Sequence, residues 1–162
     1  ASNPRGFKGL VNEMADARRE MSRHVVNWAW PFAAGGSGGI LFADNAALAY
    51  ILGSATAQDG VRCFTRNIGG SGVTTTPCLC RVYVSAVSAG STHTIRIIND
   101  AGTTFDIAGV NAAGWWPAVA GAALTVTLAA GTDHLKIQTQ RTAGIAGDVG
   151  RLNSCSVWED LS

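Results

Sequence analysis

Apolar side chains follow two different rhythms along the chain. Between residues 7 and 28 they recur at alternating steps of three and four, the spacing that places them on one seam of a coiled coil. After residue 39 they fall in short runs, several of them strictly alternating, separated by Gly, Asn, Asp and Thr. Alternating runs with such punctuation predict strands with one buried face. The pattern therefore predicts an amino-terminal helix followed by a β domain.

The predicted helix has a seam of a and d positions that is apolar at every position but His24. In chain order the seam residues are Phe7, Leu10, Met14, Ala17, Met21, His24 and Trp28. Glu13 falls at g and Arg18 at the following e, the spacing of an interchain ion pair between parallel helices. The sequence therefore predicts a parallel coiled-coil stalk that joins copies of the chain.

The start and the width of this helix support the same interpretation. Asn3-Pro4 is a good helix start, because Asn caps free amides and Pro at the first helical position loses no hydrogen bond. Val11 and Val25 at e positions widen the apolar stripe, which favours a homotrimer over a dimer. The alternative is an amphipathic helix packed on its own β domain, since globular helices show similar stripes.

A cluster of aromatic residues and a Gly-rich run mark the end of the predicted stalk. Pro31 disfavours helical geometry at Trp30 and so ends the helix. Gly35–Gly39 is a flexible connector. The predicted organisation is a helical stalk with its aromatic junction at residues 1–32, a linker at 33–39 and a β head at 40–162.

The head is predicted to be all β. About eight or nine short strands with regular turns point to an antiparallel β-sandwich of jelly-roll type. The expected strands are Ile40–Phe42, Ala47–Leu52, Val61–Thr65, Leu79–Val87, Thr92–Ile98, Thr104–Ile107, Leu124–Leu128, His134–Thr139 and Ser154–Trp158. The predicted fold class is thus mainly β with a coiled-coil stalk.

Composition excludes several classes of function. The net charge is +1 and no long basic run occurs, which argues against nucleic-acid binding. No apolar run reaches the roughly 18 residues of a bilayer-spanning helix, so no membrane insertion is expected. The first five residues lack the apolar core of a signal peptide.

The four cysteines are predicted to be small buried thiols. They are Cys63, Cys78, Cys80 and Cys155. Cys78 and Cys80 are two apart on an expected strand, so they share a face and cannot readily bridge each other. Without C-x-x-C spacing or a His cluster, no zinc site is expected, and free thiols suit assembly in a reducing cytosol.

The chain offers no pattern typical of a catalytic site. It has no G-x-S-x-G turn for a nucleophile, and the Gly-rich run Gly69–Gly72 lacks the Lys of a phosphate loop. Asp100, Asp106, Asp133 and Asp148 are expected in or near turns, where Asp is common. The sequence therefore predicts a non-enzymatic protein without catalytic residues, metal or cofactor.

Trp115 and Trp116 form the most conspicuous expected loop, between Gly114 and a run of small residues. Aromatic side chains there suit packing at a subunit interface, or contact with a receptor or a host cell-surface glycan. The sequence alone leaves these alternatives open.

Three segments resemble a known group of proteins. Leu124–Gln140 has a strand, an Ala-Gly-Thr turn and a second strand, as do many phage tail-fibre and virion jelly-roll domains. Cys155–Ser162 is similar to the closing strand of small phage minor tail proteins. Asn3–Leu10, running into an Asp-Ala-Arg-Arg helix, is similar to the start of such proteins.

This resemblance implies a structural protein of the bacteriophage virion that is assembled in the host cytoplasm. It implies a homotrimer whose helix is anchored among other virion proteins and whose head is displayed at the tail tip or tail fibre for assembly or host attachment. A capsid decoration or head-fibre protein is one alternative, and a free lectin of jelly-roll fold is another.

Overall fold

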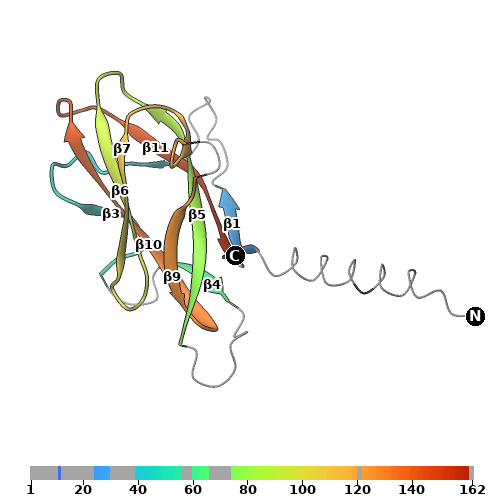
Figure 1. Cartoon of the computed structure of the whole chain (residues 1–162). Helices are drawn as coiled ribbons and strands as arrows, with labels where there is room; N and C mark the ends of the chain where they lie inside the picture. Colours follow the sequence, from blue (N-terminus) through green and yellow to red (C-terminus); the bar gives the residue numbers. More distant parts are fainter. Residues whose placement is uncertain are drawn as a thin grey trace, which may run out of the picture.

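The structure is a computed structural model that describes residue 11 and residues 24–29, 39–55, 60–65, 74–119 and 122–160. The regular elements of these residues are β-strands, which form two antiparallel sheets (Figure 1). The strands are β1 (His24–Ala29), β2 (Ile40–Leu41), β3 (Ala49–Leu52), β4 (Val61–Phe64), β5 (Thr75–Val87), β6 (Thr92–Ile98), β7 (Thr104–Val110), β8 (Gly114–Trp116), β9 (Leu124–Ala129), β10 (Thr132–Ala143) and β11 (Gly150–Glu159).

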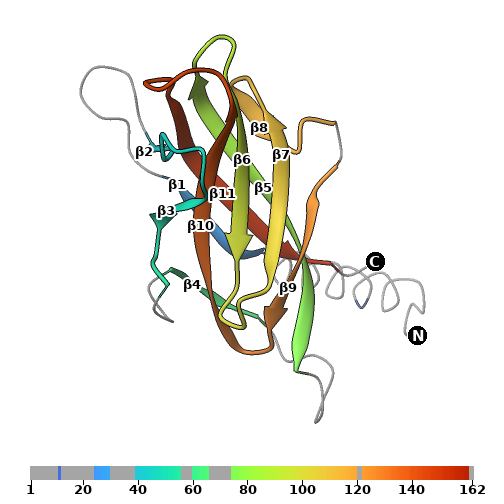
Figure 2. The same ribbon diagram turned by 90° about the vertical axis from the view of Figure 1, so that its left-hand side faces the viewer.

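The larger sheet, sheet A, has six strands in the order β1-β11-β5-β8, with β2 also beside β11 and β9 also beside β5. The smaller sheet, sheet B, has five strands in the order β3-β10-β6-β7, with β4 also beside β10. Figure 2 views the molecule from the side of sheet B, so that β10, β6 and β7 lie in front of β11 and β5. The prediction of a mainly β head built from antiparallel sheets is confirmed.

The strand pairs are nested around one central hairpin. β6 pairs with β7, and outside this hairpin β5 pairs with both β8 and β9. Further out, β3 and β4 pair with β10, and β1 and β2 pair with β11. The chain thus folds like one long antiparallel hairpin whose two arms pass from sheet to sheet, and its first and last strands lie side by side.

The two sheets share a single apolar core. Along β5 the side chains alternate, so that Cys78, Cys80, Val82 and Val84 point inward and are fully buried. They belong to the same cluster of buried residues as apolar side chains of β6, β10 and β11. Burial of this many methyl and thiol groups is the main contribution that holds the sheets together.

All four cysteines are free and buried, as the sequence predicts. The sulfur atoms of Cys80 and Cys155 lie 3.6 Å apart on neighbouring strands of sheet A. Desolvation by burial raises the pKa of Cys63 and of Cys78 to about 12. The core therefore keeps these thiols protonated, and they act there as small apolar side chains.

The nine predicted strands all occur, although their ends differ. Thr92–Ile98 has the predicted bounds, whereas β5, β10 and β11 extend further than expected. Two strands were not predicted at all, β1 and the three-residue β8. The predicted turns at Asn99–Gly102 and around Gly131 are present, and the glycine in each has the positive φ that such turns require.

The prediction that the helical seam extends to His24 and Trp28 is wrong. Residues 24–29 form β1, whose backbone pairs with β11 in a register that sets Trp28 opposite Cys155. Val25, Val26 and Trp28 are β-branched or aromatic and favour strand geometry. Pairing with β11 also satisfies the backbone groups along one edge of this segment, so the sheet takes residues that the heptad pattern had assigned to the stalk.

The remaining predicted seam lies outside the described residues. This applies to Phe7, Leu10, Met14, Ala17 and Met21, and to the predicted ion pair of Glu13 and Arg18. Val11, the one residue described before His24, has a helical backbone and is 48% exposed.

Candidate binding surface

Trp115 lies on the outer face of sheet A, at the strand that sequence reasoning had treated as a loop. In β8 it pairs with Tyr83 of β5, and its side chain is 44% exposed. Since successive residues of a strand point to opposite faces, the next residue, Trp116, points the other way. Trp116 packs against the core, and its indole Nε1 donates a hydrogen bond to the Ala112 carbonyl at 3.0 Å.

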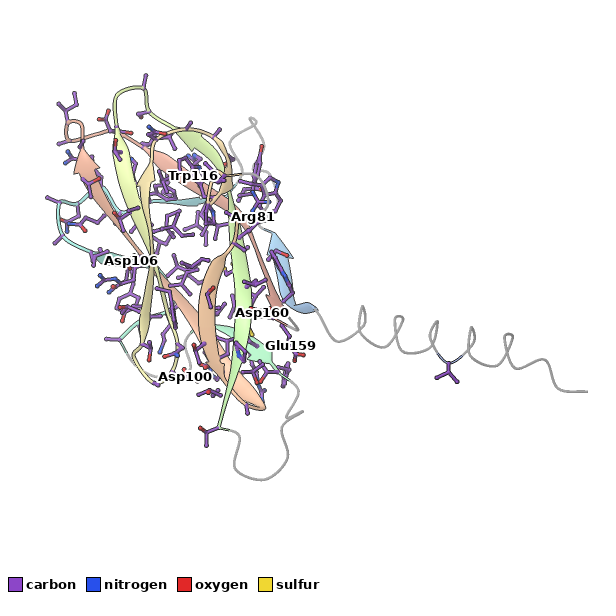
Figure 3. All side chains as sticks on the ribbon, viewed as in Figure 1. Arg81, Asp100, Asp106, Trp116, Glu159 and Asp160 are labelled. Carbon is purple, nitrogen blue, oxygen red and sulfur yellow. The ribbon has the colours of Figure 1, made fainter. Side chains whose placement is uncertain are left out.

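Two side chains of β5 share the outer face with Trp115. The ring of Tyr83 meets that of Trp115 edge to face, with 5.3 Å between centroids and 67° between planes. The guanidinium carbon of Arg81 lies 5.7 Å from the centroid of the Trp115 ring. Arg81 also donates from Nη2 to the carbonyl of Pro117 at 3.3 Å. Tyr83 and Arg81 thereby hold the ring of Trp115 in place. Figure 3 shows Arg81 and Trp116 at the same end of the molecule.

Two serines of β11 complete this surface. Ser154 is the cross-strand partner of Tyr83, and Ser156 is the partner of Arg81. Directly opposed residues of antiparallel strands present their side chains on the same face, and both serines are partly exposed. We call this surface the sheet A platform; its residues are Arg81, Tyr83, Trp115, Ser154 and Ser156.

The charge of Arg81 is not matched by a carboxylate within the described ranges. On sheet B, Arg96 holds Asp106 through two hydrogen bonds of 2.7 and 2.8 Å. Arg141 donates to Asp44 at 2.9 Å. Among the described residues, no carboxylate forms an ion pair with Arg81, and its buried Nε has no hydrogen-bond partner. The platform therefore carries a positive charge that the described part of the chain leaves unneutralised.

A second polar cluster lies where β6, β7 and β10 begin or end, and Figure 3 places Asp100 of this cluster at the end of the molecule opposite Trp116. His134 Nδ1 is 2.5 Å from Asp100 Oδ2, and Lys136 Nζ is 3.5 Å from Oδ1. β10 does not alternate between buried and exposed residues here, because Lys136 is only 4% exposed and its neighbours Leu135 and Ile137 are fully buried. Gly53 and Gly60 approach its aliphatic stem so closely that a Cβ would clash with it.

Asp133 lies beside this cluster and has a structural role. Its buried carboxylate accepts hydrogen bonds from the backbone amides of Ala129, Asp100 and His134, at 2.6 to 2.8 Å. Asp133 thus ties the β9–β10 turn to the β6–β7 turn. The prediction that Asp is used for local hydrogen bonding in turns is confirmed here, whereas Asp106 lies within β7 and faces Arg96.

His93 and Ser91 form a hydrogen-bonded pair inside the head. Ser91 Oγ is 3.1 Å from His93 Nε2 and donates to the Ser88 carbonyl at 2.8 Å. Both side chains are buried, and the imidazole meets the ring of Phe42 edge to face. Desolvation lowers the pKa of His93, so this imidazole is a neutral packing group of the core.

In the described ranges, no group of three or more His, Cys, Asp and Glu side chains is arranged to hold a metal ion. Nor does that part contain a helix long and apolar enough to cross a bilayer.

Comparison of the chain with protein-family models, with curated proteins and with solved structures gives no match in any of the three. The candidate surface is therefore identified from the geometry of the structure alone.

The structure separates the two tryptophans that the sequence had grouped as one contact site. Trp115 remains a candidate for receptor or interface contact, while Trp116 belongs to the core. Sequence reasoning missed Arg81 and Tyr83, although both lie in the expected strand Leu79–Val87. Alternation along a strand places Arg81 and Tyr83 on one face, but only the pairing of β5 with β8 and β11 brings them to Trp115 and the serines.

Proposed function

We propose that this chain is a non-enzymatic structural protein of a bacteriophage particle, which trimerises through its amino-terminal helix and displays the β head. The location we favour is the tail tip or tail fibre. The proposal combines the nested strand order of the head with the heptad pattern and the sequence resemblance at both ends of the chain.

The observation that carries the proposal is the order of the strands. Four nested antiparallel pairs, distributed over two sheets that share a core, are the arrangement of a jelly roll. Jelly rolls recur in virion and lectin domains, and in both they serve as rigid supports for contact surfaces. We therefore assign the head to a jelly-roll β-sandwich.

The segments with phage-like patterns fit this assignment. Leu124–Gln140 corresponds to β9, the turn at Gly131 and most of β10. Cys155–Glu159 forms the end of β11. These segments supply strands to both layers of the proposed sandwich.

Self-assembly is proposed to use the stalk together with the head. The heptad spacing that remains, from Phe7 to Met21, is shorter than about three heptads, and a helix of this length is marginal on its own in water. Because β1 begins at His24, the stalk would lead directly into sheet A, and the heads of a trimer would lie close to the helical bundle.

Sedimentation velocity of the full chain tests the trimer. We expect a trimer at micromolar concentration and a loss of mass for Met14→Lys, which puts a charge at a central a position. Asn12→Lys, at the outward f position of the preceding heptad, is the matched control and should remain trimeric. A full-length monomer at micromolar concentration would contradict the proposal.

The location in the particle requires a separate experiment. Gold-labelled antibodies against the head should decorate the tail of phage particles produced by a host that carries the gene. Label over the capsid would instead support the decoration or head-fibre alternative. Particles without any label would overturn assignment to the virion.

A further inference from the structure

We propose that the sheet A platform binds a saccharide that carries a carboxylate, such as a uronic acid or a sialic acid. This inference rests on the proposed function, since it supplies the ligand class for a displayed head. The inference is tested by measuring saccharide binding, whereas the proposed function is tested by oligomer mass and by location in the particle. Either proposal can therefore fail without the other.

The first argument comes from the aromatic side chains. Trp115 keeps 44% of its side chain exposed although Tyr83 and Arg81 both contact it. The C–H groups on one face of a pyranose ring are weakly positive, and the face of an indole ring is negative. An exposed tryptophan held by its neighbours is therefore suited to stack on a sugar ring with little loss of side-chain entropy.

The second argument comes from charge. Arg81 is an outward arginine without a carboxylate partner in the described part of the chain, in contrast to Arg96 and Arg141. Guanidinium groups form paired hydrogen bonds to carboxylates. A neutral sugar would leave this charge uncompensated, whereas a carboxylate on a ring stacked on Trp115 would neutralise it.

The two serines of the platform favour a saccharide over a protein partner. The platform is completed by Ser154 and Ser156, which are cross-strand neighbours of Tyr83 and Arg81. Serine is depleted in protein–protein interfaces, whose buried centres favour larger side chains. Small hydroxyls suit a saccharide better, because they donate to and accept from sugar hydroxyls without blocking the approach to the ring.

The outer face of sheet B provides an internal comparison. There Arg96 is neutralised by Asp106, and Gln138 lies opposite Arg96 on the next strand. On β4 of the same sheet, Arg62 lies over the exposed ring of Phe64, with 4.8 Å to its centroid, and this aromatic side chain is a phenyl ring and not an indole. The combination of exposed indole, unneutralised guanidinium and small hydroxyls occurs on the platform, and we assign ligand binding to it for this reason.

Calorimetric titration of the full chain with defined saccharides tests the inference. The probes are trigalacturonic acid and 3′-sialyllactose, with methyl-esterified trigalacturonate and lactose as their uncharged counterparts. We expect at least one acidic probe to bind more tightly than its counterpart by about tenfold, the worth of a charged hydrogen bond. Arg81→Gln should abolish this preference, and Trp115→Ala should abolish binding.

Arg96→Gln is the matched control, because it removes an outward arginine from sheet B and should leave binding unchanged. Circular dichroism and sedimentation of each variant check that fold and oligomer size are kept. The inference is overturned by failure of both acidic probes to bind at millimolar concentration, or by equal binding of acidic and uncharged probes. It is also overturned if Trp115→Ala changes the oligomer mass, since the platform would then be a subunit contact.

Discussion

Trp115 and Trp116 are neighbours in the chain but lie on opposite faces of sheet A. Trp115 contacts Tyr83 and Arg81 on the outer face, while Trp116 packs against the core and donates to the Ala112 carbonyl. The same residue type therefore has two different roles at consecutive positions.

Alanine substitutions should separate these roles. We expect Trp116→Ala to lower the free energy of unfolding by about 2 kcal/mol, because it removes core contacts and a hydrogen bond. Trp115→Ala should change it by less than about 1 kcal/mol, since the side chain is largely at the surface. Urea unfolding followed by circular dichroism measures both, and equal losses would contradict the assignment of faces.

Asp133 should be among the most sensitive carboxylates in the head. Its three backbone hydrogen bonds join two turns, and an amide in place of the carboxylate would direct an NH₂ group at one of the amide donors. We expect Asp133→Asn to cost about 2–4 kcal/mol of unfolding free energy. Asp106→Asn is the control, since it breaks a surface ion pair worth less than about 1 kcal/mol. A loss at Asp133 no larger than at Asp106 would contradict this role.

The contribution of Asp100 to the free energy of unfolding should depend on pH. Desolvation raises the pKa of Asp100, but the hydrogen bond and charge of His134, with the charge of Lys136, outweigh it, so the pKa lies below its usual value. The resulting stabilisation is complete above the unfolded pKa of about 3.9 and is lost as pH falls through the lower folded value.

Asp100→Asn tests this dependence. The variant should melt at a lower temperature than the wild type at pH 7, and the difference should shrink as the pH falls from 4 towards 2. Thermal melts across this range measure it. A difference that stays constant down to the lowest pH would show that the carboxylate charge is not responsible.

The cysteines should be unreactive in the folded protein. All four are buried, and desolvation raises the pKa of Cys63 and Cys78 to about 12, so almost no thiolate is present at pH 8. We expect iodoacetamide to modify none of them in native buffer and all four in guanidinium chloride, as read from intact mass. Modification of any cysteine in the native protein at the rate of a free thiol would contradict this burial.

The sequence was informative where a strand has two faces of different character. Thr92–Ile98 alternates between outward polar residues and buried ones such as Ile95 and Ile97, and its bounds were predicted correctly. Such segments can be predicted from sequence alone, because the polarity of each residue indicates whether its side chain lies on the buried or the exposed face.

Other features depend on partners that are distant in the chain. The residues of β1 fit a heptad pattern and also have β-branched and aromatic side chains, so local sequence does not decide between helix and strand; pairing with β11 does. β8 was missed because it is short, begins at Gly114 and ends just before Pro117. The platform was missed since it requires the register of β5 with both β8 and β11.

The nested strand pairs also determine when the protein can finish folding. β1 is synthesised before the other strands, yet β11, its partner, comes last. β11 also separates β1 from β5 in sheet A, so until it is made both of these strands have a backbone edge without a partner. Contacts between distant parts of a chain form slowly, and open edges invite pairing with other chains. We therefore expect the head to complete its fold only once β11 has been made, and chains that end before β11 to aggregate.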